Sequence, residues 1–135
     1  MPGVYLFDVD ETLWCSNGPV TRPMLEDLRK QGHIVGLCGN LHCFMERVTD
    51  WYNVISCTTN FDTLVTLGFL VPKQYWLKSF LISCRNADFY TMVGNELGRV
   101  NSLGFKCQSA DGEETRAAGS PWRFIVEDDF AGGVR

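Results

Sequence analysis

The sequence predicts an α/β protein, with a three-layer α/β/α architecture and a doubly wound, mainly parallel sheet. Short apolar runs alternate with segments of helical period along the chain. Strands separated by helices favour parallel pairing through right-handed crossovers. Two carboxylates directly follow the first apolar run, and ligands of such sheets bind at the carboxyl ends of strands. We expect one domain over residues 1–135, with its core over about 4–109.

The amino-terminal half is predicted to begin with a buried strand. The expected elements, in order, are a strand at 4–7, a turn-rich segment at 13–20, a helix from Thr21 to about Lys30, a strand at 33–38, a helix at 41–51 and a strand at 53–57. The hydroxyl of Thr21 is expected to cap the first helix, and Pro23 suits its first turn, where no amide donor is needed.

The carboxyl-terminal half continues the alternation. Residues 61–70 leave strand and helix open. The expected elements are then a helix from Pro72 to about Arg85, a strand at 88–93, a short helix ending at Gly104, a strand at 105–109, a loop or hairpin at 111–120 and an edge strand at 122–126. Residues 110–135 thus form a hairpin or edge strand followed by an acidic, Gly-rich tail.

A dense cluster of polar residues, Asp8-x-Asp10-x-Thr12, ends the first strand. Side chains of a strand alternate between faces, so Asp8 and Asp10 lie on one side or converge where the strand ends. Two close carboxylates need a cation or a shared proton to coexist. The alternative is a solvated acidic turn that follows a buried strand.

This segment resembles the first motif of the haloacid dehalogenase-like (HAD) superfamily of phosphotransferases, an apolar strand followed by Asp-x-Asp-x-Thr/Val. The resemblance implies a Rossmann-like HAD core and magnesium as cofactor. It implies that Asp8 attacks phosphorus and forms an aspartyl-phosphate. Asp10 would act as general acid and then as general base, oriented by Thr12.

The second family motif, a strand ending in Thr or Ser, corresponds to Cys38-Gly39-Asn40, so the hydroxyl is missing. We expect Gly39 and Asn40 to open the following helix and to hold phosphate with their amides. A simple Gly-Asn turn, with Cys38 packed in the sheet, stays open as the alternative.

The third family motif supplies a lysine near the start of the helix before the last core strand. Lys73 is the candidate here and Lys78, further along the same helix, is the reserve. A lysine there would offset the negative charge of nucleophile and phosphate. Either lysine could instead be an ordinary solvated residue.

The fourth family motif, Gly-Asp with a later acid, holds magnesium. It corresponds to Gly94-Asn95-Glu96, with Arg99 where the later acid usually falls. We expect a weakened Mg²⁺ site in which Asn95 and Glu96 complete the ligands that the resemblance implies for Asp8 and the Asp10 carbonyl. A competing metal-binding cluster is Glu127-Asp128-Asp129, which also reads as a solvated tail.

The spacing of the motifs leaves no room for a cap domain, so the chain resembles capless members of the superfamily. An open site implies a macromolecular substrate, or a homo-oligomer in which a neighbouring copy acts as lid. The net charge of −4 and the absence of basic runs argue against general nucleic-acid binding. Without a membrane-length apolar run or a signal pattern, we expect a cytoplasmic protein that binds no membrane. We also expect its six cysteines to be reduced.

Two functions follow from these motifs. The first is a magnesium-dependent phosphatase of low activity that acts on a phosphorylated substrate of unknown identity. The alternative is a degenerate domain that binds a phosphorylated ligand or a protein partner with little turnover. The first motif favours the enzyme, while the altered second and fourth motifs favour the binding module.

Overall fold

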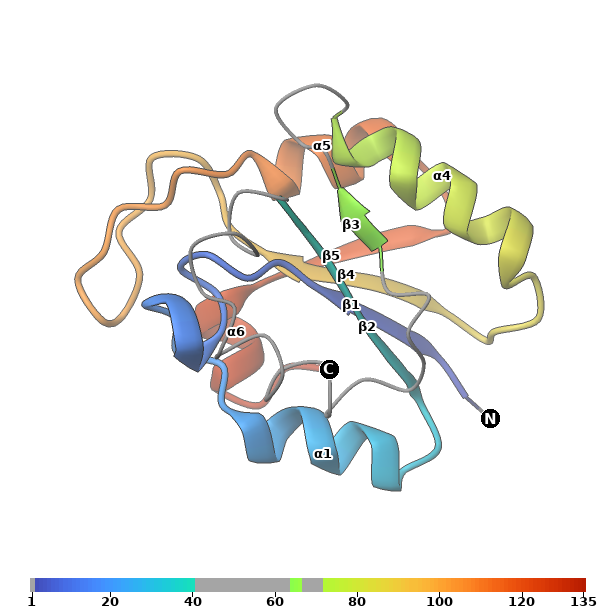
Figure 1. The fold of residues 1–135 in the computed structure, drawn as a ribbon, viewed down its shortest axis with the longest axis horizontal. Coiled ribbons are helices and arrows are strands. Elements are labelled where there is room, and N and C mark those ends of the chain that lie inside the picture. Colours follow the sequence, from blue (N-terminus) through green and yellow to red (C-terminus); the bar gives the residue numbers. More distant parts are fainter. Residues whose placement is uncertain (1, 41–63, 67–71) are drawn as a thin grey trace.

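A parallel β-sheet forms the centre of the protein. The computed structural model describes residues 2–40, 64–66 and 72–135. Within them, five strands pair in the order β3-β2-β1-β4-β5, and each neighbouring pair is parallel (Figure 1). The strands are β1 (Val4–Phe7), β2 (Ile34–Asn40), β3 (Leu64–Thr66), β4 (Tyr90–Gly94) and β5 (Trp122–Val126). The predicted α/β class with parallel pairing is confirmed.

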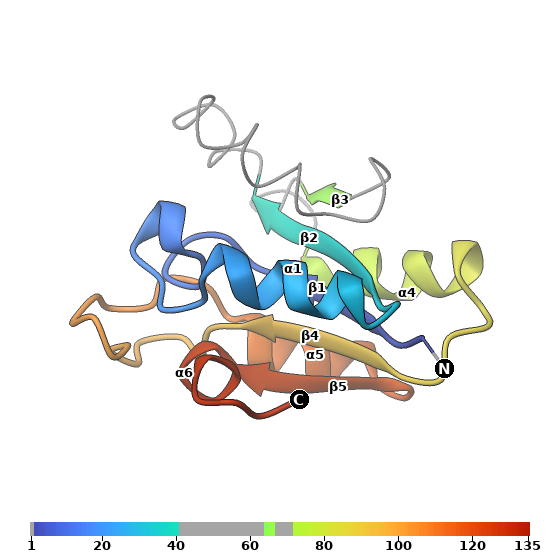
Figure 2. The ribbon, with the colours of Figure 1, turned by 90° about the horizontal axis from the view of Figure 1, so that it is seen from below.

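Helices lie against both faces of the sheet. They are α1 (Arg22–Lys30), α4 (Lys73–Ser83), α5 (Asp111–Ala118) and α6 (Glu127–Ala131), and a 3₁₀ turn, η1 (Trp14–Ser16), follows β1. Helices α1 and α6 cover one face, whereas α4 and α5 cover the other (Figures 1 and 2). None of the helices in the described residues is long and apolar enough to cross a membrane.

The alternating side chains of β1 divide the core in two. Tyr5 and Phe7 belong to a cluster with residues of α1 and α6, while Val4 and Leu6 belong to a cluster with Leu77 of α4 and Ala118 of α5. All four β1 residues are at most 2% exposed. A fully buried apolar side chain of this size contributes roughly 1.5–3 kcal/mol. This central strand is thus rigidly held where it leads into Asp8.

The expected elements at 4–7, 22–30 and 122–126 are confirmed, although the Thr21 side chain makes no capping hydrogen bond. The strand expected at 33–38 continues through Asn40, and β3 lies within the ambiguous stretch 61–70. The helix expected at 41–51 and the strand expected at 53–57 lie outside the described residues.

The prediction fails over residues 95–120. No short helix ends at Gly104, and residues 105–109 form no strand. The segment is a loop with one isolated antiparallel bridge, Val100 to Lys106. Conversely, the loop expected at 111–120 is helix α5. Acidic residues in its first turn favour a helix amino terminus, and Gly119 with φ 77° ends it. The expected tail forms α6 instead.

Candidate functional site

Asp8 lies at the carboxyl end of the central strand β1. Its backbone amide donates to the carbonyl of Val93 in β4, 2.9 Å away, and the residue is 2% exposed. The chain passes from β1 to β2 and β3 on one side, and β4 and β5 lie on the other. Asp8 therefore occupies the position at which ligands bind in open α/β sheets.

Lys73, the first residue of α4, contacts Asp8 directly. Its Nζ is 2.6 Å from Oδ1 of Asp8, and both side chains are at most 3% exposed. Lys78 is exposed, with its ammonium 6.0 Å from the Tyr75 ring. Of the two candidate lysines, the fold thus brings Lys73 to the first motif.

Asp111 completes this cluster, and sequence reasoning missed it. The first residue of α5, it is fully buried and forms an ion pair through Oδ1 with Nζ of Lys73. Its Oδ2 accepts a hydrogen bond of 2.9 Å from the Asn95 amide. A Cβ atom at Gly94 would lie 2.5 Å from Oδ2 of Asp111, so the approach requires glycine there. The Asp-Gly pair at 111–112 is typical of a turn, so the local sequence indicated a loop and not a site residue at the start of a helix.

The Asp8–Lys73–Asp111 cluster is electrostatically coupled. Burial, followed by the charge of Asp111, raises the pKa of Asp8 well above its usual range, against the opposing effect of Lys73. Burial alone would lower the pKa of Lys73, but Asp111 and Asp8 raise it above the ordinary value. Two carboxylates and one ammonium leave one negative charge uncompensated. The cluster therefore favours an added cation or proton.

The turn after Asp8 orients Asp10 differently from the prediction. The Thr12 hydroxyl donates to Oδ2 of Asp8 across 3.4 Å, so its partner in the structure is Asp8 and not Asp10. Oδ1 of Asp10 instead accepts a hydrogen bond of 2.5 Å from Ser16 in η1. Ser16 is buried, and its role carried no sequence signal beyond a turn-rich segment. Glu11, between Asp10 and Thr12, has a positive φ of 54°, as expected in a tight turn.

Asn95 lies beside the Asp8–Lys73–Asp111 cluster, whereas the Glu96 carboxylate binds Arg116 of α5. Asn95 is fully buried; its amide nitrogen Nδ2 donates to the Glu11 carbonyl, and its Oδ1 has no hydrogen-bond partner among the described residues. Glu96 forms an ion pair of 2.8 Å with Arg116 of α5, and that hydrogen bond lowers the pKa of Glu96. Asp111, rather than Glu96, is thus the second buried carboxylate next to Asp8.

These residues fit Mg²⁺ by the chemistry of their donors. Within residues 2–40, 64–66 and 72–135, no three His, Cys, Asp or Glu side chains form a metal-binding group by themselves. Magnesium, however, usually takes one or two carboxylates and keeps several waters. Asp8 and Asp111 offer two carboxylates with a charge to neutralise. The Asn95 side chain contacts the Glu11 carbonyl and the Glu127 carboxylate, and its Oδ1 is buried without a hydrogen-bond partner among the described residues.

The acidic residues of α6 hold Arg99. Glu127 is fully buried and forms an ion pair with the Arg99 guanidinium, which also contacts Oδ2 of Asp128 at 2.8 Å. Asp129 is exposed. The competing Glu127–Asp129 cluster therefore fastens the β4–α5 loop to α6, and its reading as a solvated tail is wrong for Glu127.

Gly39 and Asn40 are strand residues, paired with Val65 and Thr66 of β3. A Cβ atom at Gly39 would lie 3.1 Å from Cγ2 of Val9, so this strand end abuts the first motif. Cys38 is buried in the core, where burial raises the pKa of its thiol to about 12. The helix that Gly39 and Asn40 are expected to open lies outside the described residues, and their phosphate-binding role stays a prediction.

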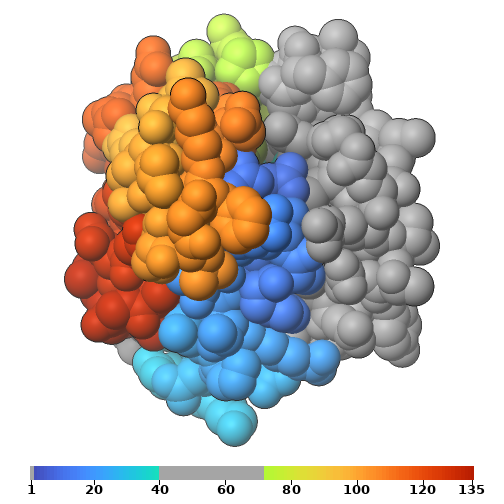
Figure 3. All heavy atoms as spheres, turned by 90° about the vertical axis from the view of Figure 1, so that its left-hand side faces the viewer, coloured from blue at the N-terminus to red at the C-terminus, as the bar shows by residue number. Residues whose placement is uncertain are grey.

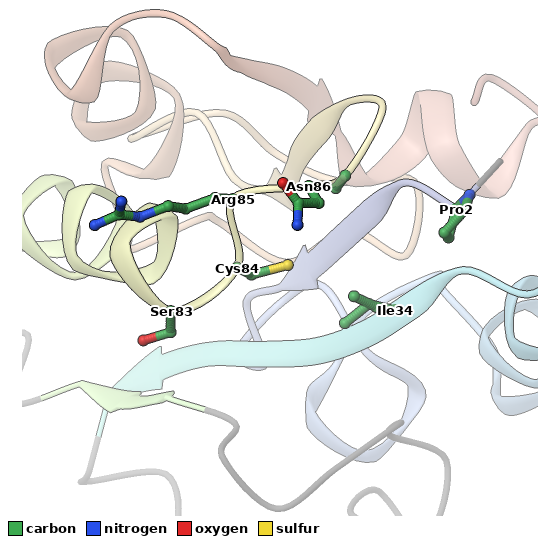
Figure 4. Close-up of a pocket in the computed structure, with 7 residues that line it drawn as sticks. Pro2, Ile34, Ser83, Cys84, Arg85 and Asn86 are labelled. Atoms are coloured by element: carbon green, nitrogen blue, oxygen red, sulfur yellow. The ribbon is translucent and has the colours of Figure 1, made fainter.

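A pocket lies at the other end of the strands. Its lining includes Pro2 before β1, Ile34 at the start of β2, Ser83 at the end of α4, and residues 84–87 between α4 and β4 (Figure 4). Because the strands are parallel, these residues lie at the edge opposite Asp8. The pocket is not part of the candidate site.

Comparisons with protein-family models, curated proteins and solved structures gave no match for this chain. The functional argument therefore depends on the residues of the site.

Proposed function

We propose that this chain is a magnesium-dependent phosphatase that hydrolyses phosphate monoesters through an aspartyl-phosphate on Asp8. The observation that carries the proposal is the buried contact of 2.6 Å between Asp8 and Lys73 at the carboxyl end of the central strand. A carboxylate placed there can act as a nucleophile, and an adjacent ammonium can offset the charge of the incoming phosphate.

The first half of the proposed reaction transfers the phosphoryl group to the protein. An Asp8 oxygen forms a bond to phosphorus while the bond from phosphorus to the ester oxygen breaks. Asp10 gives its proton to the leaving alcohol. Ser16 supports this role because its hydroxyl, bonded to Oδ1 of Asp10, restricts that side chain.

The second half releases phosphate. Asp10, now a carboxylate, removes a proton from water, whose oxygen bonds to phosphorus as the acyl-phosphate bond to Asp8 breaks. Lys73 donates to the phosphoryl oxygens or to Asp8 in both halves. Asp111 acts as a positioning residue for Lys73, since it binds the same ammonium from the neighbouring helix, α5.

The proposed metal would be held by Asp8 and Asp111, with the Asp10 carbonyl and Asn95 as neutral oxygen donors. When bound, Mg²⁺ neutralises part of the charge on the transferring phosphoryl group. The uncompensated negative charge of the buried cluster supports a cation there, and Oδ1 of Asn95 is a buried oxygen without a hydrogen-bond partner among the described residues.

We further propose the finer fold assignment, a three-layer, doubly wound HAD-like core without a cap domain. The strand order and the helices on both sheet faces support it. Between the first motif and β2, the structure contains only η1 and α1, which supports an open site on that side.

The proposal is tested by magnesium-dependent phosphate release from an aryl phosphate. Asp8→Asn is expected to abolish turnover while circular dichroism stays unchanged. The matched control is Asp129→Asn, which changes an exposed acid of α6 and should retain activity. Loss of activity in this control would show that the α6 acids belong to the site. Failure of the wild-type protein to release phosphate while still binding it would favour the degenerate binding module, which the missing hydroxyl at Cys38 also suggests.

A further inference from the structure

The β4–α5 loop contains a hairpin over residues 98–107 that backbone hydrogen bonds hold together. Gly98 donates to the Cys107 carbonyl, Cys107 donates to the Arg99 carbonyl, and Asn101 donates to the Phe105 carbonyl, with lengths of 3.0, 2.7 and 2.9 Å. These bonds flank the antiparallel bridge between Val100 and Lys106. The segment therefore has a defined shape although it contains no regular strand.

Asn101 fastens this hairpin to the first-motif turn. Its Oδ1 accepts from the amides of Leu103 and Phe105 at 3.0 Å each. Its Nδ2 donates to the carbonyls of Glu11 and Asn17, at 3.2 and 2.9 Å. One buried side chain thus joins the hairpin tip to the turn that carries Asp10.

The hairpin exposes apolar side chains beside the candidate site. Leu97, Val100, Leu103 and Phe105 are 62%, 57%, 54% and 43% exposed. They are four of the seven exposed large hydrophobic residues in the described part of the chain. Figure 3 shows the orange hairpin segment protruding directly next to the blue first-motif segment. Such a concentration of exposed apolar side chains is typical of an interaction surface.

We propose that the 98–107 hairpin, with Leu97, is the substrate-recognition surface of the Asp8 site and binds apolar side chains beside the phosphorylated residue of a protein substrate. This inference rests on the proposed phosphatase function. Asn101 holds the hairpin against the first-motif turn, so a peptide bound on the hairpin lies next to the turn that carries Asp10.

Charge selects a peptide over a polyanion. The hairpin carries two cations, Arg99 and Lys106, and Arg99 is already bound by Glu127 and Asp128. With a net charge of −4 for the whole chain, the surface lacks the clustered cations that a nucleic acid or an acidic lipid surface requires. Apolar side chains on a protruding hairpin suit an extended peptide segment.

The test measures fluorescence anisotropy of two labelled phosphoserine peptides, one with Leu and Phe beside the phosphoserine and one with Gly and Ser there. All proteins carry Asp8→Asn, so that neither peptide is hydrolysed. The apolar peptide should bind at least about tenfold more tightly, because burial of a few apolar side chains dominates such interfaces. The double variant Leu103→Ser, Phe105→Ser should lose this preference, and Ile82→Ser, an exposed apolar control on α4, should keep it.

A second variant keeps the apolar side chains of the hairpin but changes the position of the hairpin relative to the first-motif turn. Asn101→Asp retains the acceptor for the tip amides but loses the donor to Glu11 and Asn17, so the hairpin is released from the first-motif turn. We expect it to weaken binding of the apolar peptide while the Gly/Ser peptide is unaffected. Equal binding of the two peptides, or an unchanged preference in the double variant, would overturn the recognition surface.

The outcomes keep the two proposals apart. Aryl phosphate hydrolysis by the wild-type protein without peptide preference would leave the phosphatase and remove the recognition surface. Peptide preference without hydrolysis of any phosphate would do the reverse. A wild-type dimer in sedimentation that becomes a monomer in the double variant would show that a second copy of the chain covers the hairpin, and would also overturn the proposal.

Discussion

Two clusters in this protein have the same formal composition, two carboxylates around one cation, but different environments. In the Asp8–Lys73–Asp111 cluster every side chain is at most 3% exposed. In the cluster of Glu127, Arg99 and Asp128, the Arg99 and Asp128 side chains are 34% and 22% exposed. The first lies at the carboxyl end of the central strand, whereas the second ties a loop to α6.

The pKa shifts follow the burial of each carboxyl rather than its cluster, because burial raises the pKa of Glu127 as well as that of Asp8. Burial and the charge of Asp111 raise the pKa of Asp8. For Asp128, burial alone would raise the pKa, but hydrogen bonds with Ser102 and Arg99 lower it. Arg99 and Asp128 are partly exposed to water, whereas the side chains of Asp8, Lys73 and Asp111 are at most 3% exposed. Within the second cluster, Nε of Arg99 and Oε2 of Glu127 are buried without a hydrogen-bond partner among the described residues. A carboxyl whose pKa is shifted by burial and by a nearby charge, as that of Asp8 is, is typical of functional sites.

Removal of the buried cation should have the largest effect. Lys73→Met leaves two buried carboxylates without a partner, so the free energy of unfolding should fall by about 3–5 kcal/mol. Phosphatase activity should fall by about 1,000-fold, since a preorganised charge is lost. Urea unfolding and phosphate release measure the two effects, and the exposed Lys78→Met is the control. Equal effects of the two variants would remove Lys73 from the site.

Neutralising Asp111 should lower the activity and shift its pH profile. Asp111→Asn should lower activity by about 100-fold, because the Lys73 ammonium loses one of the two carboxylates that position it. Since the charge of Asp111 raises the pKa of Asp8, the acid limb of the pH profile should move to lower pH. The profile of kcat/KM measures this shift, and Glu113→Gln on the same helix is the control. An unshifted limb with full activity would make Asp111 structural only.

The Ser16 hydroxyl should matter less. Ser16→Ala frees the Asp10 carboxyl from its hydrogen bond, so kcat should fall by about tenfold while the fold persists. Steady-state kinetics with an aryl phosphate measure the change, and Ser79→Ala on α4 is the control. If kcat does not change, Asp10 is oriented by something other than Ser16.

The partly solvated cluster should have the smallest effect on activity. Arg99→Met should cost about 1–2 kcal/mol of stability, mostly by leaving Glu127 buried without its ion pair. Activity on a small aryl phosphate should stay within about threefold, since Asp8 and Lys73 keep their partners. Chemical unfolding and phosphate release on the same preparation test both statements. A loss as large as that of Asp111→Asn would erase the distinction between the two clusters.

Sequence reasoning predicted the parts of the molecule that large apolar residues define. The strands next to Asp8 and helix α1 have clear apolar periods, and Lys73, with Lys78 as the reserve, follows from the resemblance to the third family motif. Helix α5 was missed because its inner face, Asp111, Gly112, Thr115 and Ala118, is made of small and polar residues. That face is buried at helical spacing, but no hydrophobic pattern reveals it.

The missed site residues share this cause. Asp111 lies about a hundred residues after Asp8, so only the tertiary fold brings the two together. Ser16 contacts Asp10 through a turn that its sequence does not specify. Glu127, outside the site, was expected in a metal-binding cluster or a solvated tail, yet it is buried in an ion pair with Arg99. Buried polar residues of this kind are placed by their partners rather than by local sequence.

The central claim, covalent catalysis by Asp8, is tested most directly by looking for the intermediate. The protein is mixed with magnesium and a phosphorylated substrate, quenched in acid within the first turnovers, and examined by peptide mass spectrometry. The account predicts one added phosphoryl group on the peptide that contains Asp8, absent in Asp8→Asn. Turnover without this adduct, together with full activity of Asp8→Asn, would contradict it.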